Sequence, residues 1–314
     1  MTNLLLYGVT VLVWGSTWLA IEFQLGEVPP EVSVFYRYVA AAALLFGWCA
    51  LRRLRLGFDA RAHGYFALLG LCLFGLNYLL TYYAQQHITS ALSAIAFSTM
   101  LWMNIINARL IFGTRVERRV VIGSLFGIAG IVTLFFPEIE SVSWSDATLL
   151  GASLSMSGAL IASLGNMASL AAQRHALPIM QSNAWGMLYG AMLTGGYALV
   201  IGKEFAFDAS PGYVLSLGYL VVFGSIVAFG AYLTLLGRIG AQKAGYAVVM
   251  FPVVAVVLSA LFEGLTVSAN VVIGVVLVLA GNLITLARQG GSQQWLRGRF
   301  RYLLRRRSRA AAPV

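Results

Sequence analysis

Charged residues are scarce in this 314-residue sequence, at 10%, whereas 60% of the residues are hydrophobic. Soluble globular domains carry about 25% charged residues, so the composition excludes a soluble globule and a disordered chain. Cysteine, histidine and proline are also few, at 2, 3 and 7. These low counts exclude a disulfide-rich secreted domain and a collagen-like chain, and we expect no metal and no cofactor.

Long apolar runs occupy most of the chain instead. A helix that crosses a bilayer needs about 20 predominantly apolar residues. We expect ten such spans, over residues 4–23, 32–51, 65–84, 90–111, 119–136, 147–171, 182–202, 213–236, 244–262 and 268–287. The sequence therefore predicts an all-α polytopic membrane protein with ten transmembrane helices.

The loops between these runs alternate in charge. Arginine and lysine gather in 52–64, 112–118, 172–181, 237–243 and the tail, and acidic residues predominate in the other charged loops. Basic loops stay in the cytoplasm, which places all 21 Lys and Arg there except Arg37 and Lys203. We expect a multi-pass protein of the bacterial cytoplasmic (inner) membrane with both termini inside. The formal charge of +10 then needs no nucleic-acid partner.

The two halves of the sequence resemble each other. Residues 64–75 parallel 212–224, and at a constant offset 120–123 (VVIG) falls on 271–274 (VVIG) and 129–130 (AG) on 280–281 (AG). We expect a first five-helix repeat at 1–140, a second at 141–288 and a basic cytoplasmic tail at 289–314. Five is an odd number, so the second repeat must be inverted, which is typical of secondary transporters.

Three motifs carry a family resemblance: residues 14–18 (WGSTW), 37–42 (RYVAAA) and 251–253 (FPV). Together with five-plus-five spans they resemble the drug/metabolite transporter superfamily and its EamA-type ten-helix exporters. The aromatic content is most similar to that of bacterial aromatic amino acid exporters. The first half departs from the pattern, with Leu101 where Pro252 falls and Phe112 where Glu263 falls.

This resemblance implies export of small amphiphilic metabolites, including aromatic and other neutral amino acids, by alternating access. A multidrug or lipid-precursor carrier of the same fold is the alternative. The partners would be a small-molecule substrate and membrane lipid, and the chain would be a monomer or a weak homodimer. An intramembrane enzyme is not expected, because the three histidines lie near loops and the sequence has no HExxH motif.

Aromatic, amide and hydroxyl side chains within the spans are the candidate lining of a central cavity. Each alone is more often an interhelical hydrogen-bonding or packing residue. The candidate substrate-binding residues are Trp14, Asn77, Tyr78, Tyr82, Ser98, Trp102, Asn166, Trp185, Ser225 and Tyr246. Candidate hinges are Gly75, Gly224 and Pro252, whereas Gly123-x-x-x-Gly127 and Gly186-x-x-x-Gly190 favour close helix packing.

Ionisable residues are rare within the spans. Arg37 lies about five residues into the second span, or roughly 8 Å deep at ~1.5 Å per residue. We expect it to pair with Glu22 or Glu31; the alternative is that it attracts a substrate carboxylate. No Asp or Glu falls near the middle of a span, so we expect facilitated transport without obligatory proton coupling.

Overall fold

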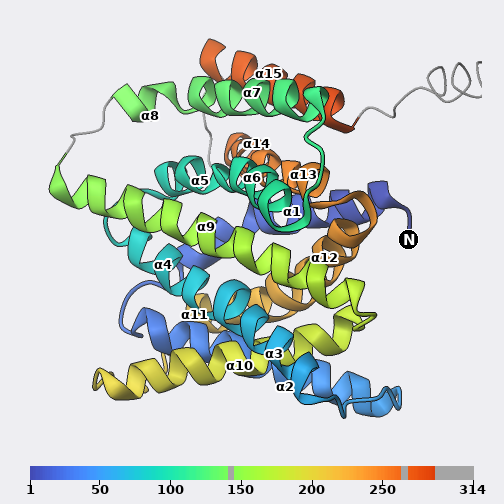
Figure 1. Cartoon of the computed structure of the whole chain (residues 1–314). Helices are drawn as coiled ribbons and strands as arrows, with labels where there is room; N and C mark the ends of the chain where they lie inside the picture. Colours follow the sequence, from blue (N-terminus) through green and yellow to red (C-terminus); the bar gives the residue numbers. More distant parts are fainter. Residues whose placement is uncertain (141–144, 263–267, 287–314) are drawn as a thin grey trace, which may run out of the picture.

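The structure is a computed structural model that describes residues 1–140, 145–262 and 268–286, where every regular element is a helix. The basic tail predicted at 289–314 falls outside these ranges (Figure 1). The helices of the first half are α1 (Asn3–Glu22), α2 (Pro30–Leu51), α3 (Ala60–Leu69), η1 (Gly70–Gly75), α4 (Leu76–Gln85), α5 (Ser90–Ser98), α6 (Met100–Phe112), α7 (Arg118–Leu134) and α8 (Phe136–Glu140). Those of the second half are α9 (Asp146–Arg174), α10 (Ile179–Val200), α11 (Pro211–Tyr219), η2 (Leu220–Val227), α12 (Ala228–Ile239), α13 (Ala241–Ala244), α14 (Tyr246–Phe262) and α15 (Ala269–Leu286).

Local sequence sets where several helices begin. A hydroxyl or carboxylate side chain caps the first free backbone N–H groups of α1, α3, α5, α9 and α11. The capping residues are Thr2, Asp59, Thr89, Ser145 and Ser210. Proline is the first residue of α2 and of α11. Its φ already suits a helix, and the N–H group that it lacks would have had no partner within the helix at this position.

Seven helical segments in the described ranges are long and apolar enough to cross a membrane. They are Asn3–Glu22, Pro30–Leu51, Ala60–Gln85, Leu92–Phe112, Asp146–Arg174, Pro211–Ile239 and Ala269–Leu286. Three further predicted spans correspond to α7, α10 and α14, of which α7 and α14 have 17 residues each. The chain is thus a multi-pass helical membrane protein. The number of ten membrane spans remains a prediction.

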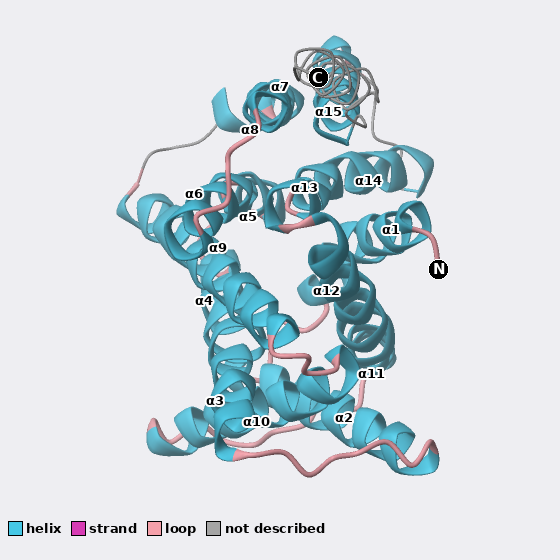
Figure 2. Cartoon of the chain, turned by 45° about the vertical axis from the view of Figure 1, so that its right-hand side comes forward, coloured by secondary structure: helices cyan, strands magenta, loops and turns pink. Residues whose placement is uncertain are grey.

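Two helix pairs lie at opposite ends of the molecule (Figures 1 and 2). Helix α7 packs along α15 at one end, and α2 packs along α10 at the other. Between them lie α1, α4, α9, α12 and α14, with α1 against both α12 and α14 and α4 against α9. The centre of the molecule is therefore built from both halves of the sequence.

Glycines bring α7 and α15 into close contact. A Cβ added at Gly130 would lie 2.8 Å from the carbonyl oxygen of Gly274, and one at Gly274 would lie 2.7 Å from the oxygen of Gly130. Gly123 meets Gly281 in the same way. Since the residue numbers run in opposite directions along the contact, the two helices are antiparallel.

The second predicted glycine pair also permits close packing. Gly186 and Gly190 of α10 lie against Phe74 of η1, where an added Cβ would come within 2.9 and 2.7 Å of the phenylalanine side chain. Gly127 of α7 lies against Tyr246. The packing role predicted for both glycine motifs is confirmed.

Two wide π-helical turns, η1 and η2, interrupt the third and eighth predicted spans. They contain the candidate hinges Gly75 and Gly224, and Pro252 lies inside α14. π-helical segments are rare and frequently mark functional sites. Motion at these three positions stays a prediction.

Candidate functional site

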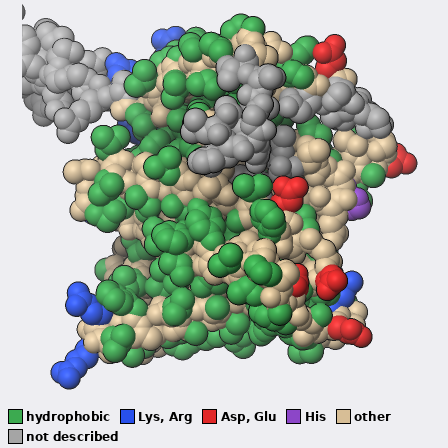
Figure 3. Space-filling model, turned by 180° about the vertical axis from the view of Figure 1, so that it is seen from behind, with side chains coloured by type: hydrophobic (Ala, Val, Ile, Leu, Met, Phe, Trp, Pro, Cys, Tyr) green, Lys and Arg blue, Asp and Glu red, His purple; other side chains and the backbone are tan. Residues whose placement is uncertain are grey.

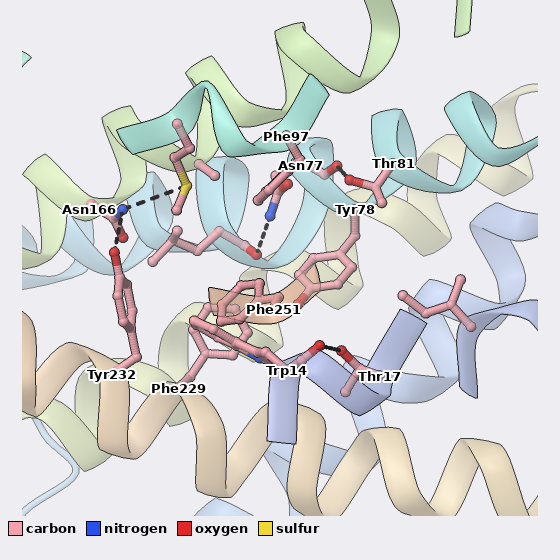
Figure 4. A pocket seen from close by; sticks show the side chains of 14 residues that line it. Trp14, Thr17, Asn77, Tyr78, Thr81, Phe97, Asn166, Phe229, Tyr232 and Phe251 are labelled. Carbon is pink, nitrogen blue, oxygen red and sulfur yellow. Dashed lines mark hydrogen bonds between the residues drawn. The ribbon is translucent and has the colours of Figure 1, made fainter. Parts of the chain in front are cut away.

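A pocket lies at the centre of the molecule, between α1, α4, α9, α12 and α14 (Figure 4). Its lining comes from both halves of the sequence: Trp14, Thr17, Ile21, Leu73, Asn77, Tyr78, Thr81, Phe97, Met100, Ala162, Asn166, Phe229, Tyr232 and Phe251. No Asp, Glu, Lys or Arg of the described residues is part of this lining.

Aromatic rings form much of the wall. The ring of Trp14 lies 4.8 Å from that of Phe229, 5.0 Å from that of Tyr232 and 5.7 Å from that of Phe251, measured between centroids. Figure 4 shows these rings gathered on one side of the pocket, with Tyr78 approaching them from α4. Edge-to-face contacts of this kind hold a flat apolar surface in place.

A hydrogen bond fixes the orientation of Trp14. Its Nε1 donates to the carbonyl oxygen of Gly224 in η2 at 3.0 Å. A π-helical turn disturbs the regular i→i−4 pattern and so offers backbone carbonyls to side chains. The hydrogen bond from Trp14 therefore links the first half of the chain to the second at the pocket wall.

Uncharged polar groups complete the lining. Asn166 Nδ2 donates to Asn104 Oδ1 at 3.1 Å and to the Tyr232 hydroxyl at 3.0 Å, which joins α6, α9 and α12. The side-chain oxygens of Asn77 and Asn166 are buried and have no hydrogen-bond partner. Because unsatisfied buried acceptors are costly, these two oxygens are suited to receive donors from a bound solute.

Arg37 lies behind this wall and is only 1% exposed. Its Nε donates to Ser225 Oγ at 2.9 Å and its Nη2 to the Tyr78 hydroxyl at 3.4 Å. The expected pairing with Glu22 or Glu31 is wrong. Glu31 instead accepts a hydrogen bond from the hydroxyl of Tyr83, and Glu22 is exposed at the end of α1.

The structure places four of the ten predicted binding residues on the pocket wall, namely Trp14, Asn77, Tyr78 and Asn166. Trp185 lies elsewhere, because its Nε1 donates to Leu56 O at 3.1 Å and its ring packs on Phe46.

Three more predicted residues are not part of the pocket lining. The Tyr246 hydroxyl donates to backbone oxygens of α7 and α15, Ser98 Oγ donates to Ile95 O within its own helix, and Trp102 packs on the hydrophobic core. Tyr82 and Ser225 are buried around Arg37 and do not line the pocket. These six residues do not line this pocket, and contact between them and a solute stays a prediction.

Ten residues that line the pocket are absent from the candidates predicted from the sequence, among them Thr17, Phe97, Phe229, Tyr232 and Phe251. The sequence holds a signal for two of these ten. Phe229 and Tyr232 follow the predicted Ser225 at i+4 and i+7, which is one face of a helix. Thr17 and Phe251 lie within the family motifs but were not given a binding role.

A second cavity lies among the basic loops that the charge pattern assigns to the cytoplasm. It is lined in part by Arg115, Glu117, Gln173, Arg174 and Lys243. Lys243 Nζ is 3.0 Å from Glu117 Oε1, and the guanidinium of Arg174 lies 3.9 Å over the ring of Phe112. Both contacts join the first half of the chain to the second. No group of three or more His, Cys, Asp or Glu side chains in the described ranges could hold a metal ion.

Together these features define a multi-pass helical membrane protein with a central pocket that is lined from both halves of the chain. Residues 2–136 and again 149–287 match the EamA-like transporter family, and the chain belongs to this family. YedA, an uncharacterized inner membrane transporter of Escherichia coli (strain K12), is 30% identical over 288 residues, which cover 88% of each chain. YoaV, an uncharacterized transporter of Bacillus subtilis (strain 168), is 23% identical over 88% of this chain and 95% of its own.

A solved crystal structure supports the fold independently. It is 17% identical in sequence, superposes with a TM-score of 0.75 and covers 90% of this chain and 96% of that chain. At this identity the likeness shows the fold alone.

Proposed function

We propose that this protein is a secondary transporter that exports small amphiphilic metabolites, aromatic and other neutral amino acids among them, by alternating access. The central pocket is the observation that carries this proposal. Its lining comes from both halves of the chain and combines apolar and aromatic side chains with a few polar groups, which is the composition of small-molecule sites. Aromatic rings suit the apolar part of such a solute, and asparagine and threonine side chains suit its polar part.

The two halves act as inverted repeats in this proposal. The family matches the chain twice, over ranges of similar length. Gly123 and Gly130 are the sequence equivalents of Gly274 and Gly281, yet Gly123 meets Gly281 and Gly130 meets Gly274. A twofold relation between antiparallel helices produces this crossed pattern. It supports a pseudo-twofold axis in the membrane plane, which is the architecture that allows two conformations of similar energy to exchange.

Charge distribution supports the proposed orientation, with ten spans and both termini in the cytoplasm. Figure 3 shows hydrophobic side chains across the middle of one face, most Lys and Arg side chains at its left edge and the Asp and Glu side chains toward its right. The positive-inside rule assigns the basic edge to the cytoplasm. The relative named an inner membrane transporter is consistent with the bacterial cytoplasmic membrane as the location.

Transport is facilitated and needs no proton gradient in this proposal, because no carboxylate of the described residues lines the pocket. Proteoliposomes test this point directly. We expect a labelled solute to equilibrate at the same level with and without a pH gradient. Accumulation above equilibrium that depends on the gradient would show obligatory coupling.

Competition in proteoliposomes tests the substrate class. Labelled phenylalanine is loaded inside, and its efflux is measured against amino acids, cationic dyes and sugars in the same compartment. We expect aromatic and other neutral amino acids to compete and sugars to have no effect. Competition by the dyes alone would favour a multidrug or lipid-precursor carrier, and no efflux above protein-free liposomes would reject the proposal.

A further inference from the structure

Arg37 is a buried cation without an acidic partner among the described residues. Its charge is stabilised in part by the ring of Tyr78, whose centroid is 4.5 Å from the guanidinium carbon, and by the ring of Tyr38 at 5.3 Å. Cation–π contacts and two neutral hydrogen bonds do not replace a counter-ion, and an unpaired buried charge is costly. The surroundings of Arg37 therefore favour binding of a negatively charged group that the chain itself does not supply.

Unused hydrogen-bond donors surround the guanidinium. Arg37 Nη1 and the hydroxyls of Tyr38 and Tyr82 are buried without a hydrogen bond of normal geometry, although Tyr82 lies close enough to Arg37, and Tyr38 to Tyr78, for a weaker one. Both tyrosines are fully buried and lie beside Arg37. A carboxylate has two oxygens that accept several hydrogen bonds, so it matches a cation flanked by hydroxyl donors.

This donor cluster adjoins the central pocket. Tyr78 belongs to both, because its ring lines the pocket and its hydroxyl accepts from Arg37 Nη2 at 3.4 Å. Thr17 also lines the pocket, and a Cβ at Gly224 would touch both Thr17 Cγ2, at 3.0 Å, and Arg37 Nη2, at 3.2 Å. Tyr78 and Thr17 therefore lie beside both the guanidinium and the cavity.

We propose that Arg37, with the hydroxyls of Tyr38, Tyr78 and Tyr82, binds the carboxylate of the transported solute. The ring or aliphatic part of the solute occupies the aromatic pocket, and the free oxygens of Asn77 and Asn166 accept from its ammonium group when it has one. The substrate class is then carboxylates with an apolar body. This inference rests on the proposed function and narrows it, because it excludes amphiphiles without a negative charge.

Paired ligands that differ only in the carboxylate test the inference. Binding to the purified full-length protein in nanodiscs is measured by calorimetry for phenylalanine against phenylalaninamide and for 3-phenylpropionate against its amide. The wild type should bind each acid at least about tenfold more tightly than its amide, since hydrogen bonds to charged groups have this magnitude. Arg37→Gln should remove the preference and keep the affinity for the amides.

Two further variants keep the test decisive. Arg52→Gln removes an exposed arginine that stacks on Trp48 and should leave the preference unchanged. Tyr82→Phe removes one hydroxyl donor and should weaken binding of the acids but not of the amides. This variant replaces Arg37→Gln in the test if Arg37→Gln is not recovered folded. Equal wild-type affinity for acid and amide, or a preference that survives both Arg37→Gln and Tyr82→Phe, would overturn the inference.

Failure of the proposed function gives a different result. If no aromatic ligand binds, the aromatic substrate class is rejected, and leucine against leucinamide and acetate against acetamide become the deciding pairs. Acid binding that depends on Arg37 would still support the carboxylate site. If acid binding in these pairs is absent or independent of Arg37, the site is rejected as well.

Discussion

At the scale of single residues, the pocket depends on side chains that are held from both halves of the chain. Trp14 is hydrogen-bonded to Gly224 O and packed against rings of α12 and α14. Trp102 was an equally good candidate from the sequence, because both tryptophans fall near the middle of apolar runs. Residue type and depth alone do not distinguish them; in the structure the pocket lining includes Trp14 and not Trp102.

Trp14→Ala should therefore weaken solute binding more than it lowers the yield of folded protein. Loss of one aromatic contact and its buried area should raise Kd about tenfold or more. Trp102→Ala is the matched control and should reduce thermal stability while leaving Kd unchanged. Calorimetry and thermal unfolding of both variants check this, and an equal rise in Kd for both would return Trp14 to a packing role.

At the scale of helices, the sequence predicted where the helices lie along the chain, but not which side of each helix faces the pocket. The apolar runs matched the helices because run length is set by membrane thickness. Boundaries moved where capping residues decide them: the run predicted at 65–84 begins at Ala60, directly after Asp59, whose side chain caps α3. The sequence did not show which side of each helix points inward, since spans such as α10 are apolar on all sides. For this reason Trp185 and Tyr246 were assigned to the pocket although they face other neighbours.

Gly130→Ala tests the close packing of α7 on α15. The added methyl group would lie 2.7 Å from Val278 Cγ2 and 2.8 Å from the backbone oxygen of Gly274, so the helices must separate. We expect a loss of about 1–3 kcal/mol in stability, as for overpacked cores.

Gly47→Ala is the control for this variant. Gly47 lies within α2, and an added Cβ meets nothing within 4 Å. Thermal unfolding in detergent should show a lower Tm for Gly130→Ala and an unchanged or higher Tm for Gly47→Ala. Equal Tm values for both variants would contradict the contact described here.

At the scale of the whole molecule, the proposed inversion assigns each loop to a side of the membrane. Arg55 lies in a basic loop, and Glu140 lies four residues after the end of the fifth predicted span. Single cysteines at these positions, in a background with Cys49 and Cys72 replaced by alanine, should react with an impermeant maleimide from opposite sides of oriented vesicles. Reaction of both cysteines from the same side would contradict the inverted arrangement of the two halves.

Both halves contribute to one pocket, and that fact links the fold to transport. A pocket between two inverted units can open to each side in turn when the units rock against each other. The glycine contacts of α7 with α15 and the π-helical turns beside the pocket belong to equivalent places in the two halves. A solute bound among Trp14, Tyr78 and Phe229 would then be exposed alternately to the two compartments.

The most direct test is the accessibility of the pocket itself. Thr17→Cys places one thiol on its wall in the cysteine-free background, and an impermeant maleimide is applied to right-side-out and to inverted vesicles. The account predicts labelling from both sides, slowed from both sides by phenylalanine. Labelling from one side only, or labelling that no solute slows, would contradict a central pocket with alternating access.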